Sequence, residues 1–264
     1  MATTKTLIVG YGITGKNLEK EIAPLYPDLS DIKQPSLFKK RKYDAYDIIF
    51  ICVDTPYLNP DTPCDLSAVR SVIIDYKQHL ADGGVFVIKS TVPPKTTTKL
   101  RCEFDVPIVF SPEYYGNTPH CNNFQFNFTI LGGNPHYCIK VQQALQHCHD
   151  ARHTFRTTDS ATAELVKYME NAWLATKVSF CGQFYEMAER LGVQYEELRE
   201  LFILDPRVNP SHTFIDRQKP YWDTHCLNKD VQTIADTMDA QLLKSVIAFN
   251  DRMKATCPAN SIGI

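Results

Sequence analysis

The stretch that decides the fold is Leu7-Ile8-Val9-Gly10-Tyr11-Gly12-Ile13-Thr14-Gly15, close to the start of a chain of 264 residues. Its first three residues form a short apolar run typical of a buried strand, and residues 16–23 are typical of a helix. Between them the glycines follow the spacing GxGxxG. A strand, this loop and a helix, in that order, are the pattern of a dinucleotide-binding βαβ unit. The sequence therefore predicts that residues 10–15 hold the phosphates of a dinucleotide.

Each glycine of this loop has its own task. Gly10 allows the tight turn, Gly12 lets a pyrophosphate approach the backbone, and Gly15 lets the helix pack against the strand. The intervening residues Tyr11, Ile13 and Thr14 are expected to line the cofactor, and the free N–H groups at the N-terminus of the helix would hold its phosphates. We expect all six residues to contact the cofactor.

An acidic residue follows the loop at the distance that ribose recognition requires. Asp31 lies 21 residues after Gly10 and would accept hydrogen bonds from the adenosine ribose, with Asp28 as the other candidate. A carboxylate there repels a 2′-phosphate, which favours NAD over NADP. Lys33 and the basic run at 39–42 would instead favour NADP, but NAD is the cofactor that we expect.

The first part of the chain alternates between strand and helix patterns. The apolar, β-branched runs at 48–53 and 85–88 predict strands buried on both faces, and residues 107–110 and 126–131 are further strand candidates. Helical stretches separate them, such as residues 67–80 after Asp65 as a candidate cap. The alternation predicts an α/β fold with a Rossmann-type parallel sheet.

The pattern changes after residue 155. Apolar residues recur at helical spacing from Ser160 to Leu191, which predicts one long helix, or two nearly collinear ones, ended by Gly192. Residues 204–222 are rich in proline and predict a loop, and residues 229–254 predict a helical region. We therefore expect two domains: an NAD-binding Rossmann-type domain of residues 1–155, and a helical central or dimerisation domain of residues 156–264.

Charge, hydropathy and cysteine content indicate which kinds of partner, location and metal site to expect. A net charge of −2 gives no concentrated positive surface, so no nucleic-acid partner is expected. The longest apolar run, residues 48–53, is too short to cross a bilayer. Nine irregularly spaced cysteines without a CxxC pair favour reduced thiols in a cytoplasmic protein and no structural zinc. The cluster at 147–153, rich in histidine, reads as a polar helix end, and no metal is expected.

Three segments outside the glycine loop carry reactive side chains. Residues 89–94 follow a predicted buried strand, at the sheet edge where α/β proteins bind ligands. Lys167 and Asn171 are spaced i, i+4 on one helix face. Cys226 precedes Lys229 and Asp230, and a helix that begins at the cysteine would favour a nucleophilic thiolate. By themselves these residues indicate only an NAD-binding oxidoreductase.

Taken together, the landmarks resemble a known family, the nucleotide-sugar dehydrogenases of the UDP-glucose/GDP-mannose type. The resemblance runs through nearly the whole chain. Its landmarks are the loop 10–15, Val53-Asp54-Thr55-Pro56, Asp65-Leu66-Ser67, Lys89-Ser90-Thr91-Val92-Pro93, Ser111-Pro112-Glu113, Leu165-Val166-Lys167-Tyr168 with Asn171-Ala172, Asp205-Pro206-Arg207-Val208, and Cys226 with Lys229-Asp230. Each landmark by itself is weak evidence for the family, but eight landmarks in the family's order are a specific signal.

The resemblance implies NAD-dependent oxidation of the C6 alcohol of a sugar nucleotide, UDP-glucose-like, to a carboxylate in two hydride transfers. It implies that Cys226 captures the aldehyde as a thiohemiacetal and later carries a thioester. Lys167 and Asn171 would bind the substrate and stabilise negative charge on its oxygen. Asp230 would act with Lys167 and a water in proton transfer.

The remaining roles also follow from the resemblance. Thr91 would position the water, Glu113 would bind substrate and assist thioester hydrolysis, and Arg207 would reach the substrate across a dimer interface. The residues expected to line the cofactor beyond the glycine loop are Val53, Thr55, Pro56, Thr91 and Lys229.

The chain departs from the family in several places. It is expected to be a short form that lacks the C-terminal nucleotide-binding domain, residues 220–225 replace a glycine-rich loop, and Gly116 and Asn117 replace an Arg and a Glu. Two alternatives therefore stay open: a single-step Lys/Asn alcohol dehydrogenase of the β-hydroxyacid type, and a non-catalytic NAD-binding protein. A homodimer through the long helix is expected, because its apolar residues cover more than one face.

Overall fold

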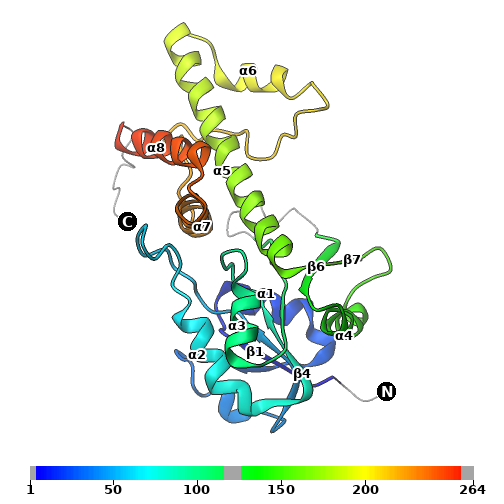
Figure 1. Ribbon diagram of the computed structural model, residues 1–264. Coiled ribbons are helices and arrows are strands. Elements are labelled where there is room, and N and C mark those ends of the chain that lie inside the picture. Colours follow the sequence, from blue (N-terminus) through cyan, green and yellow to red (C-terminus); the bar gives the residue numbers. More distant parts are fainter. Residues whose placement is uncertain (1–3, 116–125, 257–264) are drawn as a thin grey trace. The chain divides into compact units, whose positions relative to one another are not determined.

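The computed structural model describes residues 4–115 and 126–256 and divides into two compact units (Figure 1). Unit 1 comprises residues 1–56 and 64–167, and unit 2 comprises residues 57–63 and 168–264. The two units are built differently, the first around a sheet and the second from helices.

Unit 1 is built on a seven-stranded sheet in the order β2-β1-β3-β4-β5-β6-β7. The strands are β1 (Thr6–Val9), β2 (Asp28–Ser30), β3 (Tyr46–Ile51), β4 (Leu80–Ile88), β5 (Ile108–Phe110), β6 (Phe128–Gly133) and β7 (Thr154–Thr158). All neighbouring strands pair in parallel except β5 and β6, which pair antiparallel. The predicted α/β, Rossmann-type fold is confirmed, with this one antiparallel pair as a difference.

Alternation along the strands fills the core on both faces of the sheet. Ile49 and Ile51 of β3 pack with one cluster of buried residues, and Ile48 and Phe50 pack with another. Successive side chains of a strand point to opposite faces, so a continuously apolar strand must be covered twice. Helices α2 (Ser67–Tyr76) and α3 (Thr96–Phe104) supply the first cover, and α1 (Ile13–Glu21) and α4 (Pro135–Leu145) supply the second.

Helix α2 is shorter than the predicted range 67–80. It ends at Tyr76, a 3-10 turn covers Lys77–His79, and β4 already begins at Leu80. The carboxylate of Asp65 accepts a hydrogen bond of 2.8 Å from the N–H of Ser67. Asp65 therefore satisfies an N–H at the start of the helix, although Leu66 occupies the capping position.

Unit 2 is organised on α5 (Ser160–Leu191), a helix of 32 residues whose first turns belong to unit 1. It is one continuous helix, and Gly192 follows it with a φ of +69°, a left-handed conformation that suits glycine. The prediction of a long helix ended by Gly192 is confirmed. The short helix α6 (Tyr195–Phe202) comes next, and residues 203–224 form turns and loops.

The predicted helical region 229–254 consists of two helices. These are α7 (His225–Thr237) and α8 (Gln241–Thr256), and Asp239 between them has a φ of +48°. Trp222 packs beside them with Leu227 and Val231, and its indole N–H donates to the Ser179 hydroxyl at 3.0 Å. This small core fixes the start of α7 within unit 2.

Within residues 4–115 and 126–256, none of the helices combines the length and the apolar character needed to cross a bilayer.

Candidate active site

The glycine loop has the geometry that its sequence predicts. Gly10 has a φ of +95°, and a Cβ there would come within 2.5 Å of the Cys52 carbonyl oxygen. A Cβ on Gly15 would lie 2.0 Å from the Gly10 carbonyl oxygen. A Cβ on Gly12, in contrast, would meet no atom of the described residues within 4 Å. Gly10 and Gly15 are therefore required by the fold itself, whereas Gly12 borders open space.

The open space at Gly12 fits a dinucleotide pyrophosphate. Gly12 is the N-cap of α1, and no side chain caps that helix. The first N–H groups of α1 therefore stay available for an anion, in the place where the helix dipole also favours one. The loop has room for the phosphates and supplies donors to hold them.

Asp31 follows β2 and is bonded to the same loop. Its carboxylate accepts the N–H of Tyr11 and the N–H of Lys33, both at 2.7 Å. The other candidate, Asp28, is buried and accepts the hydroxyl of Tyr46 at 2.7 Å. Asp28 therefore has a structural role inside β2, and Asp31 is the acid placed beside the glycine loop.

The loops after β3 and β4 are tied together. The Thr55 hydroxyl donates to the carbonyl of Thr91 at 2.8 Å, and the Ser90 hydroxyl donates to the carbonyl of Val53 at 2.6 Å. Both loops leave the carboxyl ends of neighbouring parallel strands, where α/β sheets bind ligands. Unit 1 thus brings Val53, Thr55 and Thr91 together, and Pro56 directly follows Thr55.

Glu113 lies just after β5 and is held from two sides. One carboxylate oxygen lies 3.5 Å from the Thr14 hydroxyl and the other accepts the N–H of Tyr115 at 3.3 Å. Burial raises the pKa of Glu113, against the opposing charges of Lys89 and Lys167. A carboxylate with a raised pKa beside the dinucleotide loop is suited to accept a proton near neutral pH.

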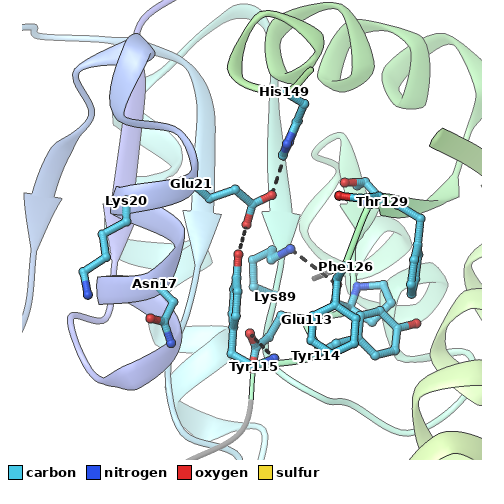
Figure 2. A pocket seen from close by; sticks show the side chains of 13 residues that line it. Asn17, Lys20, Glu21, Lys89, Glu113, Tyr114, Tyr115, Phe126, Thr129 and His149 are labelled. Carbon is cyan, nitrogen blue, oxygen red and sulfur yellow. Dashed lines mark hydrogen bonds and ion pairs between the residues drawn. The ribbon is translucent and has the colours of Figure 1, made fainter. Parts of the chain in front are cut away.

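A cavity of about 460 Å³ opens beside Glu113 within unit 1 (Figure 2). Its polar wall comes from α1, from Lys89 directly after β4 and from the segment before β7, and its aromatic wall comes from the segment after β5 and from the start of β6. The residues that line the two walls include Lys20, Glu21, Lys89, Tyr114, Tyr115, Phe128 and His149. Lys89 is buried and donates to the Ser111 hydroxyl at 3.3 Å.

Glu21 is the most strongly perturbed carboxyl group of this wall. Tyr115 donates its hydroxyl to Glu21 at 2.5 Å, and Nε2 of His149 lies 3.4 Å from the other oxygen. Burial by itself raises the pKa of Glu21, but the adjacent His149 imidazole, the charge of Lys89 and the hydrogen bond from Tyr115 outweigh it and lower the pKa to about 2. Glu21 is therefore a carboxylate over the whole physiological pH range.

Helix α5 carries Lys167 and Asn171 on successive turns, and both side chains are buried. Within unit 1, Lys167 Nζ lies 4.8 Å from the centre of the Tyr114 ring. Glu164, one turn earlier and fully buried, accepts the N–H groups of Lys95 and Thr97 at 2.6 and 2.8 Å. It joins the start of α5 to the segment that follows Thr91.

Within unit 2, Asn171 contacts α7. Its amide donates to Asp230 at 2.6 Å, and the other Asp230 oxygen accepts Lys229 Nζ, also at 2.6 Å. Asp230 is 2% exposed, so this carboxylate is removed from bulk water and fully engaged by two donors. The contact brings two predicted catalytic residues together.

Cys226 is the second residue of α7 and is exposed. Thr224 caps the helix by accepting the N–H of Leu227 at 3.3 Å. Cys226 precedes Asp230 by four residues, so the two lie on one face of α7. The expected start of a helix at the cysteine is observed within one residue.

Arg207 lies on the loop 203–224 of unit 2, where it pairs with Asp205 at 2.6 Å and stays exposed. Gly116 and Asn117 lie outside the described residues.

No sequence pattern indicated that Glu21 and Tyr115 pair in the wall of the cavity. Glu21 and Tyr115 are separated by 94 positions, and neither belongs to a motif. His149 was part of the histidine cluster, where it stacks on His153 with ring centres 3.7 Å apart. In the described part of the chain, no group of three or more His, Cys, Asp or Glu residues could hold a metal ion.

Comparison with protein families gives two matches. Residues 32–149 match the NAD-binding domain of the UDP-glucose/GDP-mannose dehydrogenase family, and residues 161–252 match its central domain. The two matches take up most of the chain. The chain belongs to this family. The resemblance inferred from the sequence is confirmed, and NAD is the cofactor of the matched domain.

Curated relatives and solved structures agree with the family. The chain is 28% identical over 250 residues to UDP-N-acetyl-D-mannosamine dehydrogenase of Methanocaldococcus jannaschii, covering 90% of this chain and 56% of the relative. It is 25% identical over 256 residues to UDP-glucose 6-dehydrogenase of Rickettsia prowazekii, covering 88% of this chain and 58% of the relative. The chain thus spans little more than half the length of these relatives.

In fold, the chain is similar to a UDP-glucose dehydrogenase from Pyrobaculum islandicum. The TM-score is 0.81 at 21% identity, over 96% of this chain and 69% of that one. The family's NAD-binding match begins at residue 32, so the glycine loop of residues 10–15 stands on its own geometry.

Proposed function

We propose that this chain catalyses the NAD-dependent oxidation of the C6 alcohol of a sugar nucleotide to a carboxylate. The main observation that supports the proposal is the buried contact between Asn171 and Asp230. Cys226 lies one turn before Asp230 on α7. A buried, fully hydrogen-bonded carboxylate near an exposed cysteine suits acyl chemistry on the thiol. The names of the relatives support a UDP-sugar such as UDP-glucose or UDP-N-acetyl-D-mannosamine.

NAD, when bound by residues 10–15 and Asp31, would supply the hydride acceptor for each oxidation, so two molecules of NAD would be reduced for each substrate molecule. Lys167 and Asn171 bind the substrate oxygen and stabilise the negative charge that it develops. Asp230 takes up the alcohol proton through a water molecule that Thr91 positions. These residues together carry the first step, which converts the primary alcohol to an aldehyde.

Cys226 carries the second oxidation. Its thiolate adds to the aldehyde carbon, a carbon–sulfur bond forms, and the oxygen takes a proton to give a thiohemiacetal. Loss of the carbon-bound hydrogen as hydride to NAD, together with loss of the hydroxyl proton, would then leave a thioester. Water attacks the thioester carbon while Glu113 accepts a proton from that water, and the carboxylate product and the thiol are released.

The remaining predicted site residues belong to the same proposal. Residues 10–15 and Asp31 bind the adenosine and pyrophosphate of NAD. Val53, Thr55, Pro56, Thr91 and Lys229 line the rest of the cofactor, and Arg207 reaches the substrate of a second protomer. The division into an NAD-binding domain of residues 1–155 and a helical domain of residues 156–264 also stays a prediction.

We also propose a homodimer through α5. Large apolar side chains of this helix in unit 2 are exposed, and they are Met169, Trp173, Phe180, Phe184, Met187 and Leu191. Exposed apolar residues in such a row favour an interface between copies of the chain.

The direct test of the activity is NADH release in the presence of UDP-glucose, UDP-N-acetyl-D-mannosamine or GDP-mannose. The proposal expects turnover of at least one of them and a uronate product. NAD binding without turnover of any of the three would favour the non-catalytic alternative, and a stoichiometry of one NADH would favour the single-step alcohol dehydrogenase.

A further inference from the structure

Glu113 is oriented by the helix that begins at the dinucleotide loop. Thr14, in the first turn of α1, lies 3.5 Å from one carboxylate oxygen of Glu113. Glu21, the last residue of α1, accepts the hydroxyl of Tyr115, whose N–H in turn donates to the other Glu113 oxygen. Figure 2 shows the Tyr115 ring extending from the segment of Glu113 to Glu21.

The two contact points lie on the same face of α1. Thr14 and Glu21 are seven residues apart, which is close to two helical turns and about 10 Å along the axis. One rigid element therefore fixes Glu113 both directly and through Tyr115. Because the same helix presents Gly12 to the pyrophosphate, the position of Glu113 is set relative to the bound dinucleotide.

Glu21 is suited to act as a permanent anchor. His149 lies 3.4 Å from its second oxygen, so both oxygens are engaged. Its pKa of about 2 keeps it ionised at every pH at which the protein works, and a carboxylate is a stronger acceptor for a tyrosine hydroxyl than a neutral group is.

We propose that Glu21 is a positioning residue that acts through Tyr115 to orient Glu113 for hydrolysis of the thioester on Cys226. This inference rests on the proposed function. Glu21 does not touch the reacting atoms. It holds the backbone segment of Tyr115 in place, and that segment holds the Glu113 carboxylate.

Glu21 also acts on Glu113 through its charge. The charged groups that act on Glu113 are Lys89 at the end of β4, Lys167 on α5 and Glu21 on α1. The two lysines lower the pKa of Glu113 and Glu21 raises it. Around Glu21 the corresponding groups are His149, Lys89 and the hydroxyl of Tyr115. Removal of the Glu21 charge therefore has a predicted sign, namely a lower pKa of Glu113.

Two variants separate the effect of the hydrogen bond between Tyr115 and Glu21 from the effect of the negative charge of Glu21. Tyr115→Phe removes the hydroxyl and keeps every charge, and Glu21→Gln removes the charge and keeps an acceptor oxygen. Lys20→Gln is the matched control, because Lys20 is exposed, lines the same cavity and lies outside this chain of contacts. Thermal unfolding of each variant shows whether it is folded.

The first readout separates the two oxidation steps. In single-turnover experiments, Tyr115→Phe is expected to slow thioester hydrolysis about tenfold, with the first NADH release and KM unchanged, so that acyl-enzyme accumulates in intact-mass spectra. In Glu21→Gln the acid limb of the hydrolysis rate is expected to move to lower pH. Equal losses in both steps, or behaviour like Lys20→Gln in both variants, would overturn the proposal.

The second readout needs no activity. In protein labelled with ¹³C-glutamate, the Glu113 carboxyl signal is assigned with Glu113→Gln and titrated with pH. The Glu113 pKa is expected to fall in Glu21→Gln and to stay unchanged in Lys20→Gln. An unchanged titration in Glu21→Gln overturns the inference. A wild-type protein that releases no NADH contradicts the proposed function instead, and leaves this titration to decide the coupling.

Discussion

The side-chain amide of Asn171 on α5 donates a hydrogen bond of 2.6 Å to the Asp230 carboxylate on α7. Both side chains are buried, and they are 59 positions apart in the chain. This contact joins the two helices of unit 2 that carry the predicted catalytic residues. The contact is therefore expected to matter both for the stability of unit 2 and for the arrangement of these residues.

We expect Asn171→Asp to destabilise the fold by about 3 kcal/mol at pH 7, because it places two carboxylates within hydrogen-bond distance in a buried site. Asp230→Asn, which leaves both groups neutral, should cost less. The double variant Asn171→Asp/Asp230→Asn restores one charge and one amide, and urea unfolding should show that it recovers most of the stability. Additive losses in the double variant would show that the contact does not govern stability.

The glycine loop offers a test of cofactor binding that leaves the fold intact. Gly12→Ala should fold normally, because its Cβ would meet no atom within 4 Å among residues 4–115 and 126–256. It should bind NAD at least about tenfold more weakly, because the methyl group occupies the space predicted for the pyrophosphate. Isothermal titration calorimetry with NAD measures this affinity.

Gly15→Ala is the comparison for this experiment. Its Cβ would lie 2.0 Å from the Gly10 carbonyl, so this variant should lose stability as well as NAD binding. Unchanged NAD affinity in folded Gly12→Ala would contradict the placement of the pyrophosphate.

Much of the fold could be predicted because short local patterns in the sequence mark many of its elements. Residue spacing and hydrophobic periodicity were enough to predict the glycine loop, the strands buried on both faces and α5. Strand β2 has only three residues, and β7 has the largely exposed sequence Thr-Phe-Arg-Thr-Thr, so neither has an apolar run to reveal it. The break between α7 and α8 falls at Asp239, whose left-handed conformation has no glycine to mark it.

The candidate site was predictable only where its residues belong to motifs. Glu113, Lys167, Asn171, Asp230 and Cys226 each sit in a short pattern. The Tyr115–Glu21 contact joins the segment after β5 to the end of α1, and such a partner is set by the tertiary fold. Local sequence carries no information about it.

The low pKa of Glu21 predicts a contribution to acid stability. Because its pKa is about 2 in the folded state and 4.5 ordinarily, Glu21 stabilises the fold above pH 4.5, and this contribution is lost as the pH falls toward 2. It amounts to roughly 3 kcal/mol at most. Urea unfolding of Glu21→Gln should therefore show a weaker decline of stability between pH 4.5 and 2 than wild type. Parallel pH curves would contradict the assignment.

The exposed apolar face of α5 predicts the oligomeric state. Trp173 and Phe180 are 60% and 50% exposed, and burial of each against a second copy should contribute about 2 kcal/mol. Trp173→Glu/Phe180→Glu should therefore sediment as one chain at a concentration where wild type sediments as two. Met238→Glu, at an exposed apolar residue outside α5, is the control. A wild-type mass of one chain at micromolar concentration would contradict the dimer.

If Cys226 carries the second oxidation, the number of NADH molecules released per substrate molecule depends on its thiol. With limiting sugar nucleotide and excess NAD, wild type is predicted to release two NADH for each substrate molecule consumed. Cys226→Ser is predicted to release one at most, because no thioester can form on it. Two NADH per substrate from Cys226→Ser, with a uronate product, would contradict the account.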